Sequence, residues 1–379
     1  MTGRYKLTKI KDYESFRYLK EDWNRLAQYD FSIYPFICYE WFDLWFKSFL
    51  KKALLNIYVL SDEGSICAII PFIKSKFIFA KKIRLAVNDH SQKIEIISDK
   101  KDLDGYIETF IDTLLSEDVS IIYLEDLLEE SASTKLILNY IKKNKHKCIY
   151  NKKFIRESVF INTSIGWDNL RATLSKKYLK NINYQKRKIY KAGKFQFIEF
   201  TRPEHFHLAC EYMEEISSES WQGKNGTGIF SREDTRAFYT GLADVASQMG
   251  WLTIWILFLD SKPIAYEYHI NTGEVDYALK AEYNRQYSEL SPGSVLDTHV
   301  VKELSNRKVG KYDILGYKEL YKTRWSNEVE KYVRIYIFKR NLIGKIYHFI
   351  EFQLRTQARK IPFLRMIKTS FKKLIKKSL

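Results

Sequence analysis

Residues 288–325 constrain the fold of this chain more than any other segment. Pro292 and Gly293 precede a helical run over residues 297–306. Pro292 fixes φ and Gly293 accepts a positive φ, so a tight loop is expected to open onto a helix whose first N–H groups have no partner within the helix. Such a start suits a phosphate or pyrophosphate, because the donors and the positive end of the helix dipole converge on it. An ordinary capped helix start explains the same residues.

Three apolar segments before this loop predict consecutive β-strands. They cover residues 251–260, 264–271 and 275–280, and short turns containing Pro263 and Gly273 separate them. Strands followed by a helix and then by a further short strand at residues 311–315 indicate an α/β fold with mixed α+β sheets.

This order of elements resembles the GNAT superfamily of N-acyltransferases. Within it, the chain is similar to the CelD/BcsL-type acetyltransferases that are related to the Fem peptidyltransferases. The similarity covers about residues 165–338, and its order and spacing are more specific than any one motif. The further matching segments are residues 174–182, residues 219–223, residues 312–316, and Tyr321 with Lys322.

The resemblance implies two GNAT-like acyltransferase domains in tandem, of which the second keeps the acyl-donor site. The co-substrate is then acyl-CoA, with acetyl-CoA the favoured form and an acyl carrier protein the alternative donor. The predicted donor-binding residues are Ser291, Gly293, Ser294 and Val295.

Length and composition fit this organisation. A chain of 379 residues exceeds one ordinary core, which favours two domains and an appendage. We therefore expect an N-terminal GNAT-like domain at 1–160, a GNAT domain with the donor site at 161–340, and a basic helical tail at 341–379. The content of 45% hydrophobic and 16% aromatic residues is sufficient for packed cores throughout.

The sequence also narrows the location of the protein. Its four cysteines include no CxxC pair, so we expect reduced thiols and no metal site. The first residues lack the apolar segment of a secretory signal, and no apolar run approaches the roughly 20 residues of a membrane helix. We predict a cytoplasmic protein that could associate peripherally with the inner membrane face. The sequence indicates no oligomeric state.

The positive charge is concentrated at the C-terminus. Of a net charge of +17, residues 339–379 contribute +11, with twelve Lys and Arg against one Glu. Apolar residues at helical spacing accompany this charge on both sides of Pro362. Two short basic amphipathic helices fit an anionic membrane surface. The alternative is a terminal helix that packs on the protein with a solvated Lys fringe, and nucleic acid is not an expected partner.

A second basic segment precedes the predicted acetyltransferase strands. Residues 171–194 hold nine Lys and Arg and no acidic residue, with an apolar stripe that includes Leu174 and Ile182. A solvated helix face explains these charges. Alternatively, the helix borders the acceptor site and attracts an anionic substrate such as a nucleotide-linked sugar.

Candidate catalytic residues follow from the chemistry of acyl transfer. The acceptor amine must lose a proton, the thioester carbonyl must be polarised, and the thiolate must regain a proton. Glu267 and His269 alternate on one predicted strand, so both side chains face the same side and could form a general-base pair. Two polar residues on an open strand face explain them as well.

Other candidates lie in the last matching segments. Asp313 is a second candidate base or acceptor anchor, unless it only caps a turn. Lys322, which the resemblance favours as functional, would polarise the carbonyl or hold phosphate, unless it is a surface lysine. We predict that Trp221, Tyr317 and Tyr321 bind the acceptor, with Trp221 stacking on a sugar ring if it does not pack in the core.

Together these features predict transfer of an acyl group to a small-molecule or carrier-linked amine. The favoured acceptor is an amino sugar in surface polysaccharide or glycolipid biosynthesis, an assignment that rests on the resemblance. The alternatives are a Fem-type aminoacyl-tRNA-dependent peptidyltransferase that acts on a cell-wall precursor, and a non-catalytic scaffold at the membrane surface.

Overall fold

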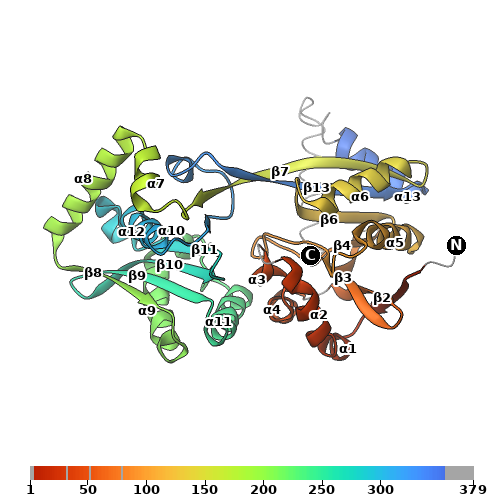
Figure 1. Cartoon of the computed structure of the whole chain (residues 1–379), viewed down its shortest axis with the longest axis horizontal. Coiled ribbons are helices and arrows are strands. Elements are labelled where there is room, and N and C mark those ends of the chain that lie inside the picture. The colour runs from red at the N-terminus through yellow and green to blue at the C-terminus, as the bar shows by residue number, and fades with distance from the viewer. Residues whose placement is uncertain (1–3, 31–32, 51–52, 78–79, 355–379) are drawn as a thin grey trace. The chain divides into compact units, whose positions relative to one another are not determined.

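The computed structural model describes residues 4–30, 33–50, 53–77 and 80–354 (Figure 1). They form two compact units, and each is built from separate stretches of chain. The first unit contains Met1–Tyr39, Leu50–Ile155 and Lys331–Leu379, and the second contains Glu40–Phe49 and Arg156–Glu330. The expected division into domains at 1–160 and 161–340 and a tail at 341–379 stays a prediction.

A mixed sheet organises the first unit. Its strand order is β1-β2-β3-β4-β6-β13, in which only the β4–β6 pairing is parallel, and β5 pairs with β3. The strands are β1 (Lys6–Ile10), β2 (Leu54–Asp62), β3 (Ser65–Phe77), β4 (Ala80–Leu85), β5 (Ile97–Ser98), β6 (Ile121–Leu128) and β13 (Val329–Lys339). The helices are α1 (Tyr13–Arg17), α2 (Lys20–Ala27), α3 (Tyr34–Ile37), α5 (Leu103–Ser116), α6 (Ala132–Lys143) and α13 (Leu342–His348), with a π-helical turn at Phe349–Leu354.

The second unit contains a second mixed sheet. Its order is β7-β12-β11-β10-β9-β8, with β11 and β12 parallel and the other neighbours antiparallel. The strands are β7 (Cys148–Asn162), β8 (Phe195–Phe200), β9 (Leu252–Leu259), β10 (Lys262–Asn271), β11 (Val275–Tyr283) and β12 (Lys311–Asp313). The helices are α4 (Tyr39–Phe49), α7 (Trp167–Thr173), α8 (Lys176–Ala192), α9 (Phe206–Glu219), α10 (Trp221–Lys224), α11 (Glu233–Gln248) and α12 (Pro292–Asn306).

Both units repeat one order of elements, which confirms the predicted α/β fold with tandem GNAT-like sheets. In each, three antiparallel strands lead into a helix and then into a strand that pairs in parallel with the third. In the second unit these elements are β9, β10, β11, α12 and β12, and they lie close to the predicted ranges. The continuous apolar sequence of β9 fits its burial on both faces.

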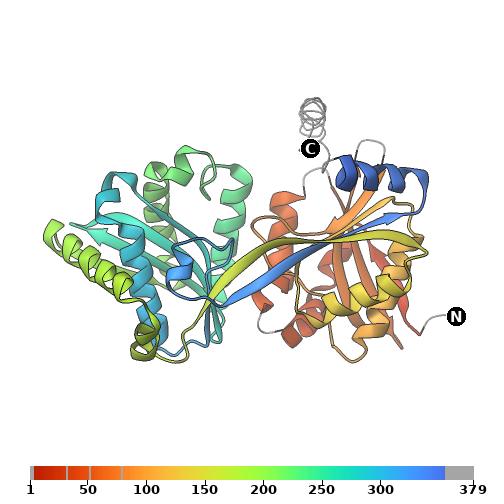
Figure 2. The same cartoon turned by 90° about the horizontal axis from the view of Figure 1, so that it is seen from above.

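Helices cover both faces of the second sheet (Figures 1 and 2). On one face, Ala265 of β10 packs in a cluster with Val295 and Leu296 of α12, and Ile182 of α8 joins that cluster. On the other face, the hydroxyl of Tyr268 donates to a carbonyl of α11. The alternation of β10 therefore directs Glu267 and His269 towards α12.

Long-range packing assigns the aromatic helix α4 to the second unit. Trp41 packs edge-on against Phe238 of α11, with ring centroids 5.4 Å apart, and Phe49 lies 5.1 Å from the same ring. The basic segment at 171–194 forms two helices, α7 and α8, because Leu174 adopts an extended conformation and Ser175 caps α8. The predicted tail begins as α13, and its part beyond Leu354 lies outside the described residues.

Candidate active site

His269 lies at the centre of a fully buried charge cluster. Its Nδ1 is 2.5 Å from Oδ1 of Asp276 on β11, and its Nε2 is 3.0 Å from Oε2 of Glu267. Burial lowers the pKa of His269, but the two carboxylates outweigh burial and raise it to about 10. Both ring nitrogens therefore carry protons near neutral pH. The general-base role predicted for His269 does not fit this arrangement, and the imidazolium instead stabilises two negative charges.

Glu267 stays a candidate base, and its hydrogen bonds are made through one of its two carboxylate oxygens. Within the described ranges, both of its hydrogen bonds end on Oε2, which accepts from His269 and, at 3.3 Å, from the hydroxyl of Tyr312. Oε1 is therefore the atom that can accept a further proton. The predicted adjacency of Glu267 and His269 on one strand face is confirmed by their hydrogen bond.

Asp297 of α12 joins this cluster, although the sequence analysis did not single it out. Trp325 Nε1 donates to its Oδ2 at 2.6 Å. Burial first, and then the charge of Glu267, raise the pKa of Asp297 to about 8. A partly buried carboxyl with a pKa near neutrality can give as well as take a proton. The sequence contains one indication that Asp297 belongs to the site. Asp297 follows Gly293 by four residues, so both lie on the same face of the helix.

Asp313 and Lys322 hold the turn that follows β12. Asp313 accepts from Leu315 N at 3.0 Å, and Lys311 Nζ lies 3.5 Å from its other oxygen. Lys322 Nζ donates to the carbonyls of Leu315 at 2.7 Å and Tyr317 at 3.0 Å, and burial lowers its pKa. Leu315 and Gly316 both have positive φ, so this turn is strained and needs such support. Roles in proton transfer or phosphate binding stay predictions for both residues.

The start of α12 differs in one respect from the expectation. The positive φ lies at Ser291, at 53°, and not at Gly293. The first helical bond runs from Val295 N to Ser291 O, so the N–H groups of Gly293 and Ser294 precede it. Val295 packs its side chain in the core and uses its N–H in the helix, so it does not fit the predicted donor-binding role. Ser294 is exposed, and Gly293 carries no side chain that would hinder a ligand.

Among the predicted acceptor-binding residues, Trp221 and Tyr321 have neighbours that indicate where they lie. Trp221 on α10 is 56% exposed, so it is not a core residue. The preceding Ser220 donates to the buried carboxylate of Glu282 on β11, which fixes α10 beside the end of that strand. Burial, followed by the charges of Glu319, Asp297 and Glu267, raises the pKa of Tyr321, which places this half-exposed tyrosine next to the acidic cluster. Tyr317 is exposed, and its role stays a prediction.

The basic helix α8 borders this cluster. The ring of Tyr178 packs edge-on against Trp325, with centroids 5.1 Å apart, and Ile182 and Ile189 are buried in the core. The basic residues of α8 therefore lie on a helix whose apolar side adjoins the tryptophan that bonds Asp297. This position suits the prediction that α8 attracts an anionic acceptor.

The sequence predicts neither a metal site nor a membrane-spanning helix. Over the described ranges, no group of three or more His, Cys, Asp or Glu has the arrangement of a metal site. In those same ranges no helix combines the length and apolarity needed to cross a bilayer. The cysteines Cys38, Cys67, Cys148 and Cys210 are free thiols.

Comparison with known structures supports the fold. The C-terminal domain of a putative lysylphosphatidylglycerol synthetase from Agrobacterium fabrum aligns over 87% of this chain and 95% of its own, with a TM-score of 0.54 and 8% identity. FemX aligns over 82% of this chain and 93% of its own, with a TM-score of 0.52 and 10% identity. A protein of unknown function from Bacteroides thetaiotaomicron covers 88% and 100%, with a TM-score of 0.52 and 12% identity. At these identities the likeness concerns the fold alone.

One family model matches part of the sequence. A search of curated protein sequences found no match. Residues 176–323, from the start of α8 to the segment after β12, match the model of the acetyltransferase (GNAT) domain. This range contains α12, Glu267, His269 and Asp297, and therefore most of the cluster described above. Residues 176–323 thus form a GNAT acetyltransferase domain, and this domain supports N-acyltransferase activity.

Proposed function

We propose that this protein transfers an acyl group, in the first place acetyl, from coenzyme A to the amine of an amino sugar on a nucleotide or lipid carrier. The observation that carries the proposal is the arrangement along α12. The first N–H groups of α12, at Gly293 and Ser294, lie about 6 Å along the helix axis from Asp297. One rigid helix therefore fixes a site for the donor phosphates relative to a group that can exchange a proton.

The cluster supplies the proton transfers of direct acyl transfer. Glu267 takes a proton from the acceptor ammonium, and the amine attacks the thioester carbonyl. The carbon–sulfur bond then breaks, and the second proton lost from the nitrogen passes to solvent. Asp297, protonated near neutral pH because its pKa is about 8, gives its proton to the departing thiolate. Proton exchange between the two neighbouring carboxyl groups restores the resting state. His269 acts as a positioning residue, because its hydrogen bond holds Oε2 of Glu267 in place.

A product assay tests this proposal. The full chain is incubated with acetyl-CoA or with aminoacyl-tRNA, and with UDP-linked amino sugars, and products are identified by mass spectrometry. We expect an acetyl mass increment on an amino sugar that depends on acetyl-CoA. The likeness to FemX motivates the second donor, and transfer from aminoacyl-tRNA alone would replace the proposal with a Fem-type activity. Absence of transfer from either donor would favour the scaffold hypothesis.

The donor site at the start of α12 gives a separate prediction. Ser294→Asp places a carboxylate where the donor phosphates are expected, so coenzyme A should bind at least about tenfold more weakly. The fold should be retained, because an acidic residue in the first helical turn stabilises a helix by about 0.3–1 kcal/mol. Calorimetric titration with coenzyme A measures the effect, and Ser294→Asn is the matched neutral control. Equal affinity of both variants would exclude this helix start from the donor site.

The C-terminal helix supports a membrane-borne acceptor. Tyr347 of α13 packs in a cluster with Tyr336 and Phe338 of β13, whereas Leu342 and Ile346 on its other side are 73% and 47% exposed. The predicted apolar face of this helix is thus divided, and its outer part remains accessible. Residues 355–379, which follow in the sequence, hold nine Lys and Arg and no acidic residue. Exposed apolar side chains beside strong positive charge favour an anionic lipid surface as the partner.

A substitution on this outer face tests the membrane proposal. Ile346→Glu should reduce sedimentation with phosphatidylglycerol vesicles, because it replaces an apolar contact with a charge that the lipid repels. The fold should be unaffected, since the side chain is exposed. Leu208→Glu, at an exposed position of α9, is the matched control. Binding that Ile346→Glu leaves intact, or that high salt does not weaken, would contradict a role for α13 at an anionic surface.

A further inference from the structure

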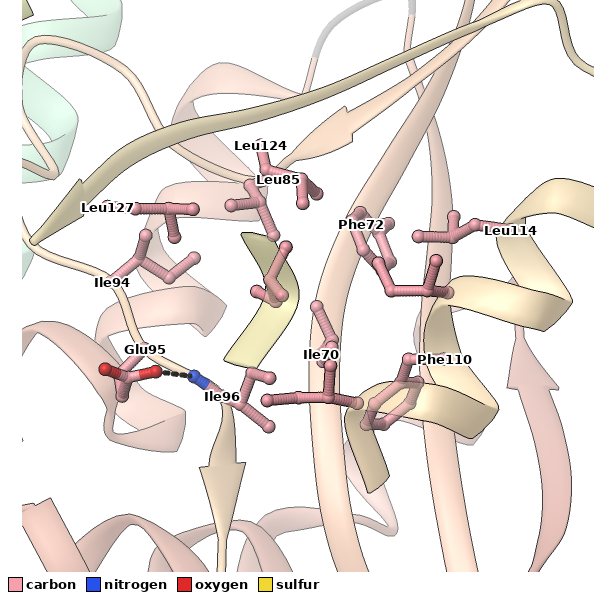
Figure 3. Close-up of a pocket in the computed structure, with 13 residues that line it drawn as sticks. Ile70, Phe72, Leu85, Ile94, Glu95, Ile96, Phe110, Leu114, Leu124 and Leu127 are labelled. Atoms are coloured by element: carbon pink, nitrogen blue, oxygen red, sulfur yellow. Dashed lines mark hydrogen bonds between the residues drawn. The ribbon is translucent and has the colours of Figure 1, made fainter. Parts of the chain in front are cut away.

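A cavity in the core of the first unit is too small for a ligand. In this unit β4 and β6 pair over a short stretch, at residues 82–84 and 121–123. Between β3, β6 and α5, apolar side chains such as Ile70, Phe110 and Leu124 line a cavity of only about 20 Å³, with Glu95 at its edge (Figure 3). A cavity of that size holds at most about one water molecule. The surface of the second unit offers the stronger candidate for a further binding partner.

A row of exposed side chains follows α8 along most of its length. The row consists of Lys177, Lys180, Tyr184, Arg187 and Lys191, which are all exposed and recur every three or four residues. This spacing places them on one side of the helix, which we call the outer face of α8. Ile182 and Ile189, whose side chains are buried in the core, lie on the opposite side. The outer face therefore points to solvent and extends about 20 Å along the helix.

Within the described part of the chain, no carboxylate pairs with the charges of the outer face of α8. The helix contains seven Lys and Arg and no acidic residue. Over the described ranges, Lys188 is the one basic residue of α8 that forms an ion pair, with Glu289 at 3.5 Å, and it lies outside the row. The four basic residues of the outer face therefore present their charges to solvent.

The chemistry of the outer face fits an anionic lipid surface. Tyr184 lies within the row and is 56% exposed, and Tyr190 beside it is 57% exposed. Tyrosine is enriched where a membrane meets water, and anionic headgroups attract Lys and Arg. A flat anionic surface contacts the whole row at once, whereas a small dianion contacts one or two turns of the helix. The exposed Leu342 and Ile346 of α13 favour lipid over a polynucleotide, which gains little from apolar side chains.

We propose that the outer face of α8 lies against an anionic lipid surface, with the helix axis parallel to that surface. The opposite side of α8 adjoins the candidate active site, because Tyr178 packs edge-on against Trp325 and Trp325 donates to Asp297. The thickness of one helix, about 10 Å, then separates the lipid headgroups from the acidic cluster. This inference deepens the proposed function and rests on it in one respect, because it selects the lipid carrier over the nucleotide carrier for the acceptor amine.

Vesicle binding by the full chain tests this contact in the absence of acyl donor and acceptor. Sedimentation with phosphatidylglycerol vesicles is compared with sedimentation with phosphatidylcholine vesicles, and we expect tighter binding to the anionic lipid. Lys180→Gln combined with Arg187→Gln removes two charges from the outer face and should weaken binding to phosphatidylglycerol at least about tenfold. Both side chains are exposed, so the fold should be retained, which circular dichroism checks.

A matched variant removes the same charge from another part of the chain. Lys142→Gln combined with Lys143→Gln changes two exposed positions of α6 in the first unit and should leave vesicle binding nearly unchanged. The C-terminal segment is the same in both variants, so a difference between them reports on α8. Equal binding by the two variants, equal binding of the wild type to both lipids, or a loss of affinity for a single-stranded RNA oligonucleotide and not for the vesicles would overturn the proposal. Failure of acyl transfer to an amino sugar would leave these binding results unchanged, so the two proposals fail independently.

Discussion

Glu267→Gln is expected to lower kcat about 10²–10⁴-fold while the affinity for coenzyme A stays unchanged. The amide cannot accept a proton from the acceptor ammonium, yet it preserves the shape and much of the hydrogen bonding of the side chain. Glu267 is only 4% exposed and lies on β10, whereas the predicted donor-binding residues lie at the start of α12, so donor binding should not change. Single-turnover acetylation of an amine acceptor measures the effect. Glu289→Gln, at a position with 89% side-chain exposure, is the control and should behave as wild type.

A pH profile and two further variants distinguish the group that takes the proton from the group that gives it. In the wild type, kcat should fall above about pH 8, because Asp297 then loses the proton that the thiolate requires. Asp297→Asn should remove this pH dependence and slow the reaction. If Glu267→Gln retained the wild-type rate and Asp313→Asn abolished it, the base would be Asp313, and the cluster around His269 would be structural.

Removal of the His269 side chain is expected to destabilise the second unit by about 3–5 kcal/mol. His269→Ala leaves Glu267 and Asp276 as neighbouring buried carboxylates without the positive charge between them. Urea unfolding of this unit measures the change in free energy. His207→Ala, whose side chain is 91% exposed, should change stability by less than about 0.5 kcal/mol.

The pH dependence of stability provides an independent check. The pKa of His269 is raised from 6.5 to about 10 by folding, so the stability that it contributes is fully present below pH 6.5 and is lost as the pH rises towards 10. His269→Ala should abolish this alkaline loss. A variant that also carries Glu267→Gln and Asp276→Asn should regain much of the stability, because no buried charge then remains unpaired. An unchanged slope between pH 6.5 and 10 would contradict a charged imidazole.

The candidate site divides into contacts that are local in sequence and contacts that are not. The adjacency of Glu267 and His269 follows from the two-residue repeat of a strand, and the helix start at residues 291–294 follows from its proline and glycine. In contrast, Asp276 reaches His269 through the β10–β11 pairing, whose register shifts between Tyr268 and His269. Asp297 meets Trp325 across 28 residues. Such contacts depend on packing, which single-sequence patterns do not encode.

The pairing of β10 with β11 also explains why His269 is not the base that the sequence predicts. A histidine next to one glutamate is a plausible base, because one ring nitrogen remains able to accept a proton. A second carboxylate on the opposite nitrogen helps to raise the pKa of the ring to about 10, and only the pairing with β11 brings Asp276 there.

The sequence by itself determined the strand–helix order of the acetyltransferase half and the position of its donor loop, because turn residues and side-chain periodicity act over a few neighbouring positions. Tertiary structure decided the charge state of His269, the recruitment of Asp297 to the site, and the packing of α4 into the second unit. Each of these depends on contacts that form only when strands pair and helices pack, since burial and neighbouring charge are properties of the assembled fold.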